Sequence, residues 1–380
     1  MKSSPVLLCS FLFGIAALAA EPPASYAPPK PSAEVSAIRL TWHDATRDRD
    51  VPVKIYYPKD SVGRLPVILF SHGLGGSREG YEYLGIHWAG CGYISIHLQH
   101  VGSDDAVWKG KEPAEITKAL TAAAMNLKNA ADRPRDVSFA IDRLTELDSD
   151  AAFPLKGRLD LQRIGVAGHS FGGFTSMAIA GQDFGSIRMG DPRVKAVIEM
   201  SAPVARPLQR DYAYAKITVP VFHMTGTRDD SPIGETKASE RRILFELMNA
   251  AETCLLVFKD GDHMVFSGRI RRDETKAAQD AVFQRLICAG STAFWDAWLK
   301  GDAAAHTWLM DGGFARLLAN EGTFEKKIPA GRSGAMTKPA PLPKGSLVSS
   351  FSPPKLVAFS FLLPQCRREC ALLSNRRLFG

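Results

Sequence analysis

Long hydrophobic runs are missing from this sequence. Its two clearest apolar stretches, residues 6–18 and 356–363, are shorter than the roughly 20 residues that a membrane-spanning helix needs. Cysteine is also scarce, with six in 380 residues, and the cysteine spacing is not that of a zinc site. We therefore expect no stable membrane span and no bound metal.

A charge excess of one sign is absent from most of the chain, although the whole carries a formal net charge of +7. Residues 331–380 hold eight cations and a single anion, Glu369, which accounts for the entire excess. The remainder is close to neutral, so a nucleic-acid partner is not expected. We interpret residues 331–380, which are rich in Pro, Ser and Lys, as a basic disordered tail.

The N-terminal region has the pattern of an export signal. A lysine, an apolar run and a small-residue stretch follow one another in residues 1–20, so we expect cleavage there and a periplasmic or secreted protein. Residues 21–34 contain five prolines and predict an extended linker. Five cysteines remain after cleavage, and either Cys254 with Cys288 or Cys366 with Cys370 could pair in an oxidising compartment.

Residues 35–330 predict one domain in which strands and helices alternate. Residues 35–42 and 51–57 predict an antiparallel hairpin at a sheet edge. The following apolar runs lack strict alternation, which is typical of parallel strands covered on both faces. Strands are expected at 66–70, 93–96, 164–167, 194–198, 219–224 and 253–258, and helices at 81–89, 135–147, 174–180, 236–249 and 273–289. This order indicates an α/β fold with a doubly wound, mostly parallel sheet.

A glycine-flanked serine lies where such a fold can expose a nucleophile. Gly168-His169-Ser170-Phe171-Gly172 follows the strand at 164–167 and precedes a helical stretch. That strand–turn–helix context is required of a nucleophile elbow, which predicts Ser170 as the nucleophile. A glycine-rich turn with a serine cap is the alternative reading.

A serine nucleophile needs a histidine base and an acid, in the chain order Ser, Asp, His. Asp229 and Asp230 both lie in the polar turn after the strand at 219–224; we favour Asp229, but adjacent carboxylates cannot be separated by sequence. His263 lies in the loop after the strand at 253–258 and is the predicted base.

Two backbone N–H groups are needed to hold an oxyanion. Phe171, directly after the nucleophile, would supply one, and Leu74 in the glycine-rich loop after residues 66–70 would supply the other. Residues 108–133 interrupt the strand–helix rhythm and could form a lid or pocket wall. Trp108, Phe171 and Met264 are candidate wall residues.

The remaining histidines suggest weaker alternatives. His97 and His100 near Asp104 and Asp105 could form a metal site, although structural or pocket-lining roles are favoured. His169 is expected to point away from the cleft if Ser170 points into it.

These motifs resemble a known family. Phe70-Ser71-His72-Gly73-Leu74-Gly75 and Gly168-His169-Ser170-Phe171-Gly172-Gly173 are similar to the platelet-activating-factor acetylhydrolase group of the α/β-hydrolases. Residues 294–302 are similar to dienelactone hydrolases, and the general layout is similar to bacterial polyester hydrolases. The resemblance implies a serine esterase without cofactor that acts on a small-molecule or lipid ester, with its acid at Asp229 as in bacterial relatives.

The expected function is therefore hydrolysis of carboxylic esters through Ser170, His263 and Asp229 by way of an acyl-enzyme. A serine peptidase or amidase of the same fold is an alternative, and so is a catalytically silent binding protein. No motif in the sequence predicts the acyl or alcohol specificity or the oligomeric state.

Overall fold

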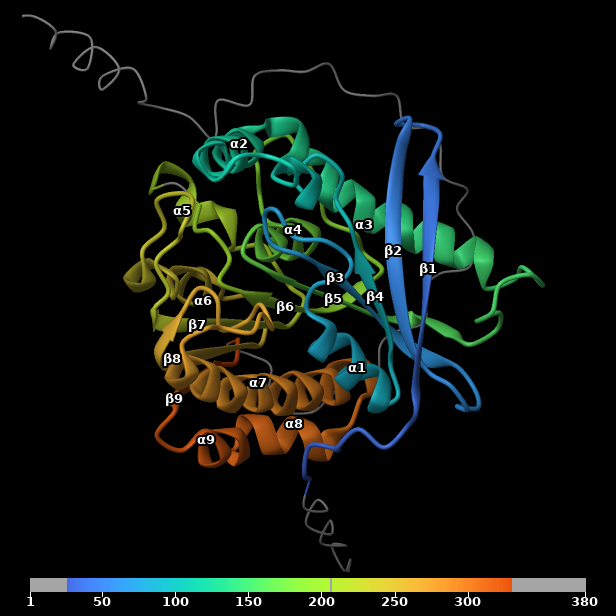
Figure 1. Cartoon of the computed structure of the whole chain (residues 1–380). Coiled ribbons are helices and arrows are strands. Elements are labelled where there is room, and N and C mark those ends of the chain that lie inside the picture. The colour runs from blue at the N-terminus through green and yellow to red at the C-terminus, as the bar shows by residue number, and fades with distance from the viewer. Residues whose placement is uncertain (1–25, 206, 330–380) are drawn as a thin grey trace, which may run out of the picture.

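The computed structural model describes residues 26–205 and 207–329. The predicted export signal at 1–20, the start of the linker at 21–25, the tail at 331–380, Cys366 and Cys370 lie outside the described residues. Strands and helices alternate along the described chain and build one sheet with helices on both faces (Figure 1). The predicted α/β class is confirmed.

The sheet has the order β1-β2-β4-β3-β5-β6-β7-β8-β9. Its strands are β1 (Val35–Asp44), β2 (Arg49–Pro58), β3 (Leu65–Ser71), β4 (Ile94–Leu98), β5 (Leu159–His169), β6 (Val194–Met200), β7 (Val221–Arg228), β8 (Thr253–Asp262) and β9 (Gly322–Lys327). The strands from β4 to β8 in this order are parallel, whereas β1, β2 and β9 pair in antiparallel fashion at the two edges. The predicted edge hairpin is β1–β2.

The helices cover the two faces of the sheet. The α-helices are α1 (Glu82–Gly90), α2 (Pro113–Met125), α3 (Leu127–Leu147), α4 (Phe171–Ile179), α5 (Pro207–Ala213), α6 (Ile243–Leu247), α7 (Glu274–Trp295), α8 (Ala303–Met310) and α9 (Gly313–Leu318). Short turns of other helix types are η1 (Asp105–Val107), η2 (Ala238–Glu240) and η3 (Asp296–Lys300). Helices α3 and α4 lie on one face, and α1 and α7 lie on the other (Figure 1).

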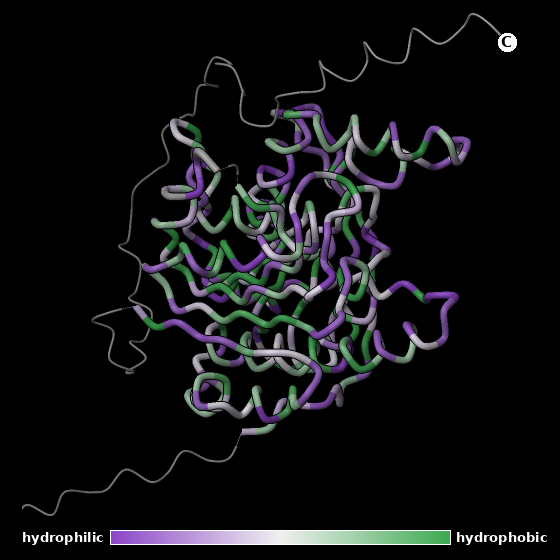
Figure 2. Tube along the Cα trace, turned by 90° about the vertical axis from the view of Figure 1, so that its left-hand side faces the viewer, coloured by the Kyte–Doolittle hydropathy of each residue, from purple (hydrophilic) through white to green (hydrophobic). Residues whose placement is uncertain are grey.

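Both faces of the central strands are buried because alternate side chains point to opposite helix layers. In β3, Val67 and Leu69 pack in the core beneath α3, whereas Ile68 and Phe70 pack in the core beneath α1 and α7. Figure 2 shows this as hydrophobic residues concentrated along the strands in the middle of the molecule. The helix layers on both faces hold the sheet in place. The candidate site lies at the carboxyl ends of its central strands.

Several elements differ from the sequence-based expectation, among them one expected helix, the start of α3 and one edge strand. The helix expected at 236–249 is only the short η2 and α6, with a bend between them. Helix α3 begins at Leu127 and not at the expected residue 135. Asn126, directly before it, accepts a hydrogen bond from the Lys128 N–H and caps the helix. Strand β9 was not predicted, because GTFEKK is polar and pairs only along one edge of β8.

The described end of the proline-rich segment lies against the body of the protein. Tyr26 donates a hydrogen bond to Asp296 over 2.7 Å and packs against the Trp308 ring. Cys91 and the pair Cys254 and Cys288 are free thiols, so the first suggested disulfide is not formed. In the described ranges, no helix combines the length and the apolar character that a bilayer crossing requires.

Candidate active site

Ser170 occupies a sharp turn between β5 and α4. Its backbone φ is 56° and its ψ is −116°, a conformation that non-glycine residues rarely adopt. A Cβ on Gly168 would collide with the Gly172 backbone, and one on Gly172 would collide with the Ser71 backbone. The two glycines therefore let the turn close against β3, which leaves Ser170 at the carboxyl end of the central strands.

His263 and Asp229 reach Ser170 from the neighbouring strand ends. His263 Nε2 lies 2.9 Å from Ser170 Oγ, and His263 Nδ1 lies 2.7 Å from Asp229 Oδ1. Because a carboxylate only accepts, Nδ1 carries the proton and Nε2 is left to accept from the serine hydroxyl. These distances are those of a nucleophile, a base and an orienting acid in contact.

The Asp229 carboxylate is buried and fully partnered. Its Oδ2 accepts hydrogen bonds from Ser201 Oγ at 2.5 Å and Thr225 Oγ1 at 2.7 Å, and Arg241 Nη2 lies 3.3 Å from Oδ1. Burial alone would raise the pKa of Asp229, but the His263 hydrogen bond, the Arg241 charge and the Ser201 hydroxyl lower this pKa overall. Asp229 is therefore held ionised beside His263.

Asp230 lies outside this cluster. Its exposed carboxylate accepts from the Ala238 N–H and contacts Lys237 in the surface turn that leads to η2. The two adjacent aspartates thus have different surroundings, which sequence could not distinguish.

One backbone N–H group in the loop after β3 has no acceptor among the described residues. The Gly73 N–H donates to Tyr81 Oη at 3.2 Å, and the Gly75 N–H donates to the Ser103 carbonyl at 2.9 Å. Between them, the Leu74 N–H donates to no other described residue, and the same holds for the Phe171 N–H at the start of α4. Within the described residues both N–H groups are unpaired, and their use as the two oxyanion donors stays a prediction.

A chain of hydrogen bonds joins this loop to His263. Tyr81 Oη lies 2.8 Å from His169 Nδ1, and His169 Nε2 lies 2.9 Å from the His263 carbonyl. Since the carbonyl can only accept, His169 donates through Nε2 and accepts at Nδ1 from the Tyr81 hydroxyl, which itself accepts from Gly73. Burial holds the pKa of His169 well below its ordinary value, which keeps this neutral tautomer.

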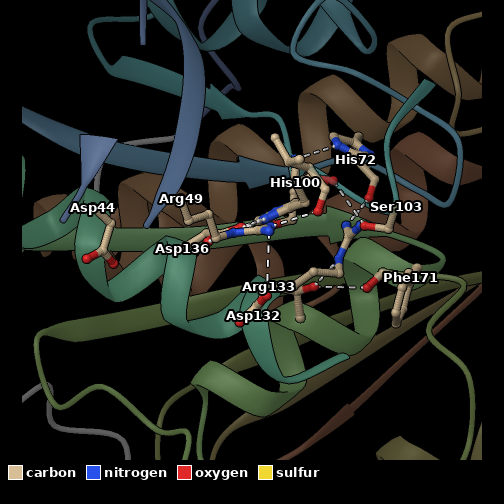
Figure 3. A network of polar contacts seen from close by, with 12 residues as sticks. Asp44, Arg49, His72, His100, Ser103, Asp132, Arg133, Asp136 and Phe171 are labelled. Carbon is tan, nitrogen blue, oxygen red and sulfur yellow. Dashed lines mark hydrogen bonds and ion pairs between the residues drawn. The ribbon is translucent and has the colours of Figure 1, made fainter. Parts of the chain in front are cut away.

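A second polar network lies behind the loop, on the side of α3 (Figure 3). Asp136 accepts from Arg49 at 2.8 and 2.9 Å and contacts His100 Nδ1 at 2.9 Å. Burial alone would raise the pKa of Asp136, but these hydrogen bonds and charges lower it strongly. Burial also lowers the pKa of His100, to about 4, so this histidine is neutral.

Residues 108–133 cover part of the glycine-rich loop that follows β3. Trp108 Nε1 donates to the Gly75 carbonyl at 2.7 Å, and a Cβ placed on Gly75 would meet both Trp108 and Leu120 of α2. Most of α2 is exposed, and Ala123 is its buried residue. The segment thus forms a wall over the loop.

The alternative metal site is not assembled. His97 Nδ1 contacts the Gly80 carbonyl, whereas His100 contacts Asp136 and Ser71. Asp104 instead accepts from Gln99 at 2.8 Å. Across residues 26–205 and 207–329, no group of three or more His, Cys, Asp or Glu side chains is arranged to hold a metal.

Sequence reasoning missed several residues that shape the site: Tyr81, Arg133, Ser201, Thr225 and Arg241. Ser201 directly follows β6, and Thr225 lies in the carboxyl-terminal half of β7; these positions were a usable signal. Arg133 and Arg241 lie in helical or turn segments far along the chain, where no local pattern separates a buried arginine from a surface one.

Two family models match consecutive parts of the chain. Residues 37–109, which include Leu74, match platelet-activating factor acetylhydrolase, isoform II. Residues 120–274, which include Ser170, Asp229 and His263, match the PET hydrolase-like family.

Curated relatives are platelet-activating factor acetylhydrolases of mammals. The protein of Canis lupus familiaris is 30% identical over 44% of this chain and 41% of its own length, and that of Bos taurus is 26% identical over the same shares. The protein of Cavia porcellus is 28% identical over 35% of this chain and 36% of its own. The chain thus spans about two fifths of the curated relatives it matches. Together with the nine-stranded, mostly parallel sheet, these matches show that the chain belongs to the α/β-hydrolase superfamily and carries platelet-activating factor acetylhydrolase-like and PET hydrolase-like regions.

Proposed function

We propose that this protein is an exported serine esterase that hydrolyses carboxylic esters through an acyl-enzyme. The single observation that carries the proposal is the contact series Ser170 Oγ–His263 Nε2 at 2.9 Å and His263 Nδ1–Asp229 Oδ1 at 2.7 Å. Both matched families are families of carboxylic ester hydrolases, which favours an ester over an amide.

In the first half-reaction, Ser170 Oγ attacks the ester carbonyl carbon while His263 Nε2 takes the hydroxyl proton. The carbonyl π electrons move to oxygen, and the Leu74 and Phe171 N–H groups donate to that oxyanion. Asp229 stabilises the imidazolium through Nδ1–H. When the tetrahedral intermediate collapses, the C–O bond to the alcohol breaks and the alcohol takes the proton from His263.

In the second half-reaction, water replaces the alcohol. His263 Nε2 takes a proton from water, the hydroxide attacks the acyl carbon, and the same two N–H groups hold the oxyanion again. Collapse breaks the bond to Ser170 Oγ, which recovers its proton from His263. The products are a carboxylic acid and the free serine, and no cofactor takes part.

The substrate class is proposed as a small-molecule or lipid ester, in line with the acetylhydrolase relatives. The half-buried Phe171 and Trp108 beside the donors provide apolar surface for the acyl or alcohol group. Export is proposed from residues 1–20, and the N-terminal sequence of the mature protein after expression in a bacterium with a periplasm tests it. An uncleaved, cytosolic product would overturn the export proposal.

The test of activity is hydrolysis of p-nitrophenyl esters from acetyl to palmitoyl by wild type and Ser170→Ala. We expect turnover of at least one ester by wild type and loss of about 10⁴-fold or more in the variant. A matched p-nitroanilide series separates amide from ester hydrolysis. Equal inertness of both proteins toward every ester would overturn the proposed esterase, and preferential anilide cleavage would point to a peptidase or amidase.

A further inference from the structure

The guanidinium of Arg133, on α3, is completely buried, and its contacts gather on the two backbone segments that carry the candidate oxyanion donors. We propose that Arg133 is a positioning residue that sets the spacing between the Leu74 and Phe171 N–H groups. This inference rests on the proposed ester hydrolysis and adds to it a residue that touches neither substrate nor Ser170.

The first donor is held on both sides. Arg133 Nη2 donates to the His72 carbonyl, two residues before Leu74. Arg133 Nη1 donates to Ser103 Oγ at 2.9 Å, and the Ser103 carbonyl accepts from the Gly75 N–H, directly after Leu74. The peptide that bears the Leu74 N–H is therefore tied to one guanidinium from both directions.

The second donor is held through its own residue. The Arg133 guanidinium lies over the Phe171 ring, 4.5 Å from the ring centroid. Arg133 Nε donates to Thr175 Oγ1 at 2.9 Å, and that hydroxyl donates to the Phe171 carbonyl at 3.0 Å. Ring and carbonyl of Phe171 are thus both fixed relative to the group that fixes Leu74.

The planar guanidinium explains why arginine stands here. Nε, Nη1 and Nη2 point in three fixed directions within one plane, and each has a different acceptor. A lysine ammonium could carry the charge but could not span the three acceptors from one rigid plane. His72 follows β3, Ser103 follows β4 and Thr175 lies on α4. The acceptors are therefore far apart in sequence, so Arg133 sets a distance that no local turn sets.

The positive charge of Arg133 lies close to the two candidate oxyanion donors. Within residues 26–205 and 207–329, no carboxylate forms an ion pair with Arg133. Asp136 nearby already contacts Arg49 and His100 (Figure 3), and it also pairs with Arg47. Burial lowers the pKa of Arg133 to about 9, which leaves it protonated at neutral pH. Its positive charge therefore lies behind both donors, where it favours negative charge on the bound oxygen.

The test compares Arg133→Met with Arg49→Met, a buried arginine of the same network that contacts Asp136 and the Val101 carbonyl but neither donor segment. For Arg133→Met we expect kcat for a p-nitrophenyl ester to fall about 100-fold with KM within about threefold, because a misplaced oxyanion hole acts on the transition state. For Arg49→Met we expect kcat within about threefold of wild type at a temperature below its Tm.

A second readout separates positioning from a general loss of structure. An alkyl trifluoromethyl ketone adds to the serine as a tetrahedral oxyanion, so its Ki should rise in parallel with the fall in kcat/KM across the Arg133 variants. Arg133→Lys should recover less than about tenfold of the loss. Full recovery by lysine, or an inhibitor Ki that stays at the wild-type value while kcat falls, would overturn the role of the guanidinium.

If Arg133→Met does not fold, Thr175→Val provides the same test. It is close to isosteric and cuts only the bridge from Arg133 Nε to the Phe171 carbonyl, so we expect a fall of about tenfold in kcat and a matching rise in inhibitor Ki. A folded Thr175→Val with wild-type kcat and Ki overturns the proposal. Activity of wild type and inactivity of Ser170→Ala are required in the same assay, so failure of the esterase proposal is seen separately.

Discussion

Two buried arginines serve different halves of the candidate site. Arg133 donates to the His72 carbonyl and to the hydroxyls of Ser103 and Thr175, beside the predicted oxyanion donors. Arg241 donates to the carbonyls of Ser201, Ala202 and Asp229 and lies 3.3 Å from the Asp229 carboxylate. Both fix backbone segments by several donors at once, yet only Arg241 has a carboxylate in contact.

The difference follows from the charge that each half must handle. The acid half contains a permanent negative charge on Asp229, which a buried cation compensates. In the proposed reaction the oxyanion half gains its negative charge only during turnover, which fits an Arg133 cation without a paired carboxylate among the described residues of the resting protein. A buried charge costs free energy when it is unpaired, and such a cost is expected where the charge has a catalytic use.

The largest expected effect is on the acid half. Asp229→Asn should lower kcat by about 10⁴-fold, because an asparagine amide no longer holds the His263 tautomer with Nε2 unprotonated. The adjacent Asp230→Asn serves as control and should keep kcat within about threefold, since Asp230 is exposed and contacts Lys237. Steady-state kinetics on one ester measure both; comparable losses in the two variants would show that the acid is wrongly assigned.

Next in size is the loss of the compensating cation. Arg241→Met should lower the free energy of unfolding by about 3 kcal/mol, because Asp229 loses a charged partner and three carbonyls lose donors. The neighbouring Arg242 is half-exposed and paired with Glu246 and Glu325, so Arg242→Met should cost less than about 1 kcal/mol.

Chemical denaturation monitored by fluorescence measures the free energy of unfolding of Arg241→Met and Arg242→Met. Measuring both kcat and this free energy for Arg241→Met and Arg133→Met makes the comparison between the halves more specific. For each tenfold fall in kcat, Arg241→Met should lose more unfolding free energy than Arg133→Met. The reverse ratio would mean that the two arginines do not divide the work as the contacts indicate.

A smaller effect is expected for the link between the halves. Tyr81→Phe removes the hydroxyl that joins the Gly73 N–H to His169, and we expect about a tenfold fall in kcat and a stability loss of about 1–2 kcal/mol. Tyr83→Phe is the matched control: its hydroxyl donates to the Phe266 carbonyl over 3.0 Å. If both variants lose stability but keep kcat, the link between the halves has only a structural role.

The last expected effect is confined to acid pH and acts on stability. Burial lowers the pKa of five histidines: His72, His87, His97, His100 and His169. The unfolded chain binds protons near pH 6.5, whereas the folded His87 and His100 do so only near about 4. Their contribution is therefore complete at neutral pH and is lost as the pH falls from about 6.5 toward 4.

Thermal unfolding between pH 7.5 and 5 measures this loss. His87, which contacts Thr292 away from the site, should account for about 2 kcal/mol at pH 5. His87→Gln should flatten the pH dependence by that amount, and exposed His43→Gln should not change it. A profile for His87→Gln that is as steep as wild type would show that His87 is protonated in the folded protein.

The fold class followed from local patterns in the sequence. Buried parallel strands such as β3 and β6 are nearly continuous apolar runs, so their positions could be read directly, whereas the polar edge strand β9 could not. The bend between η2 and α6 was missed because helical periodicity does not record where the chain must turn to place Arg241.

The sequence by itself determined where Ser170, His263, Leu74 and Phe171 stand relative to the strands, because glycine spacing and strand ends are local properties. Only the tertiary structure decided which of Asp229 and Asp230 faces His263, since both follow the same strand. It also decided that Arg133 lies behind the oxyanion donors and Arg241 behind the acid. The physical reason is that a buried charge is identified by its partners, and these partners come from distant segments that only folding brings together.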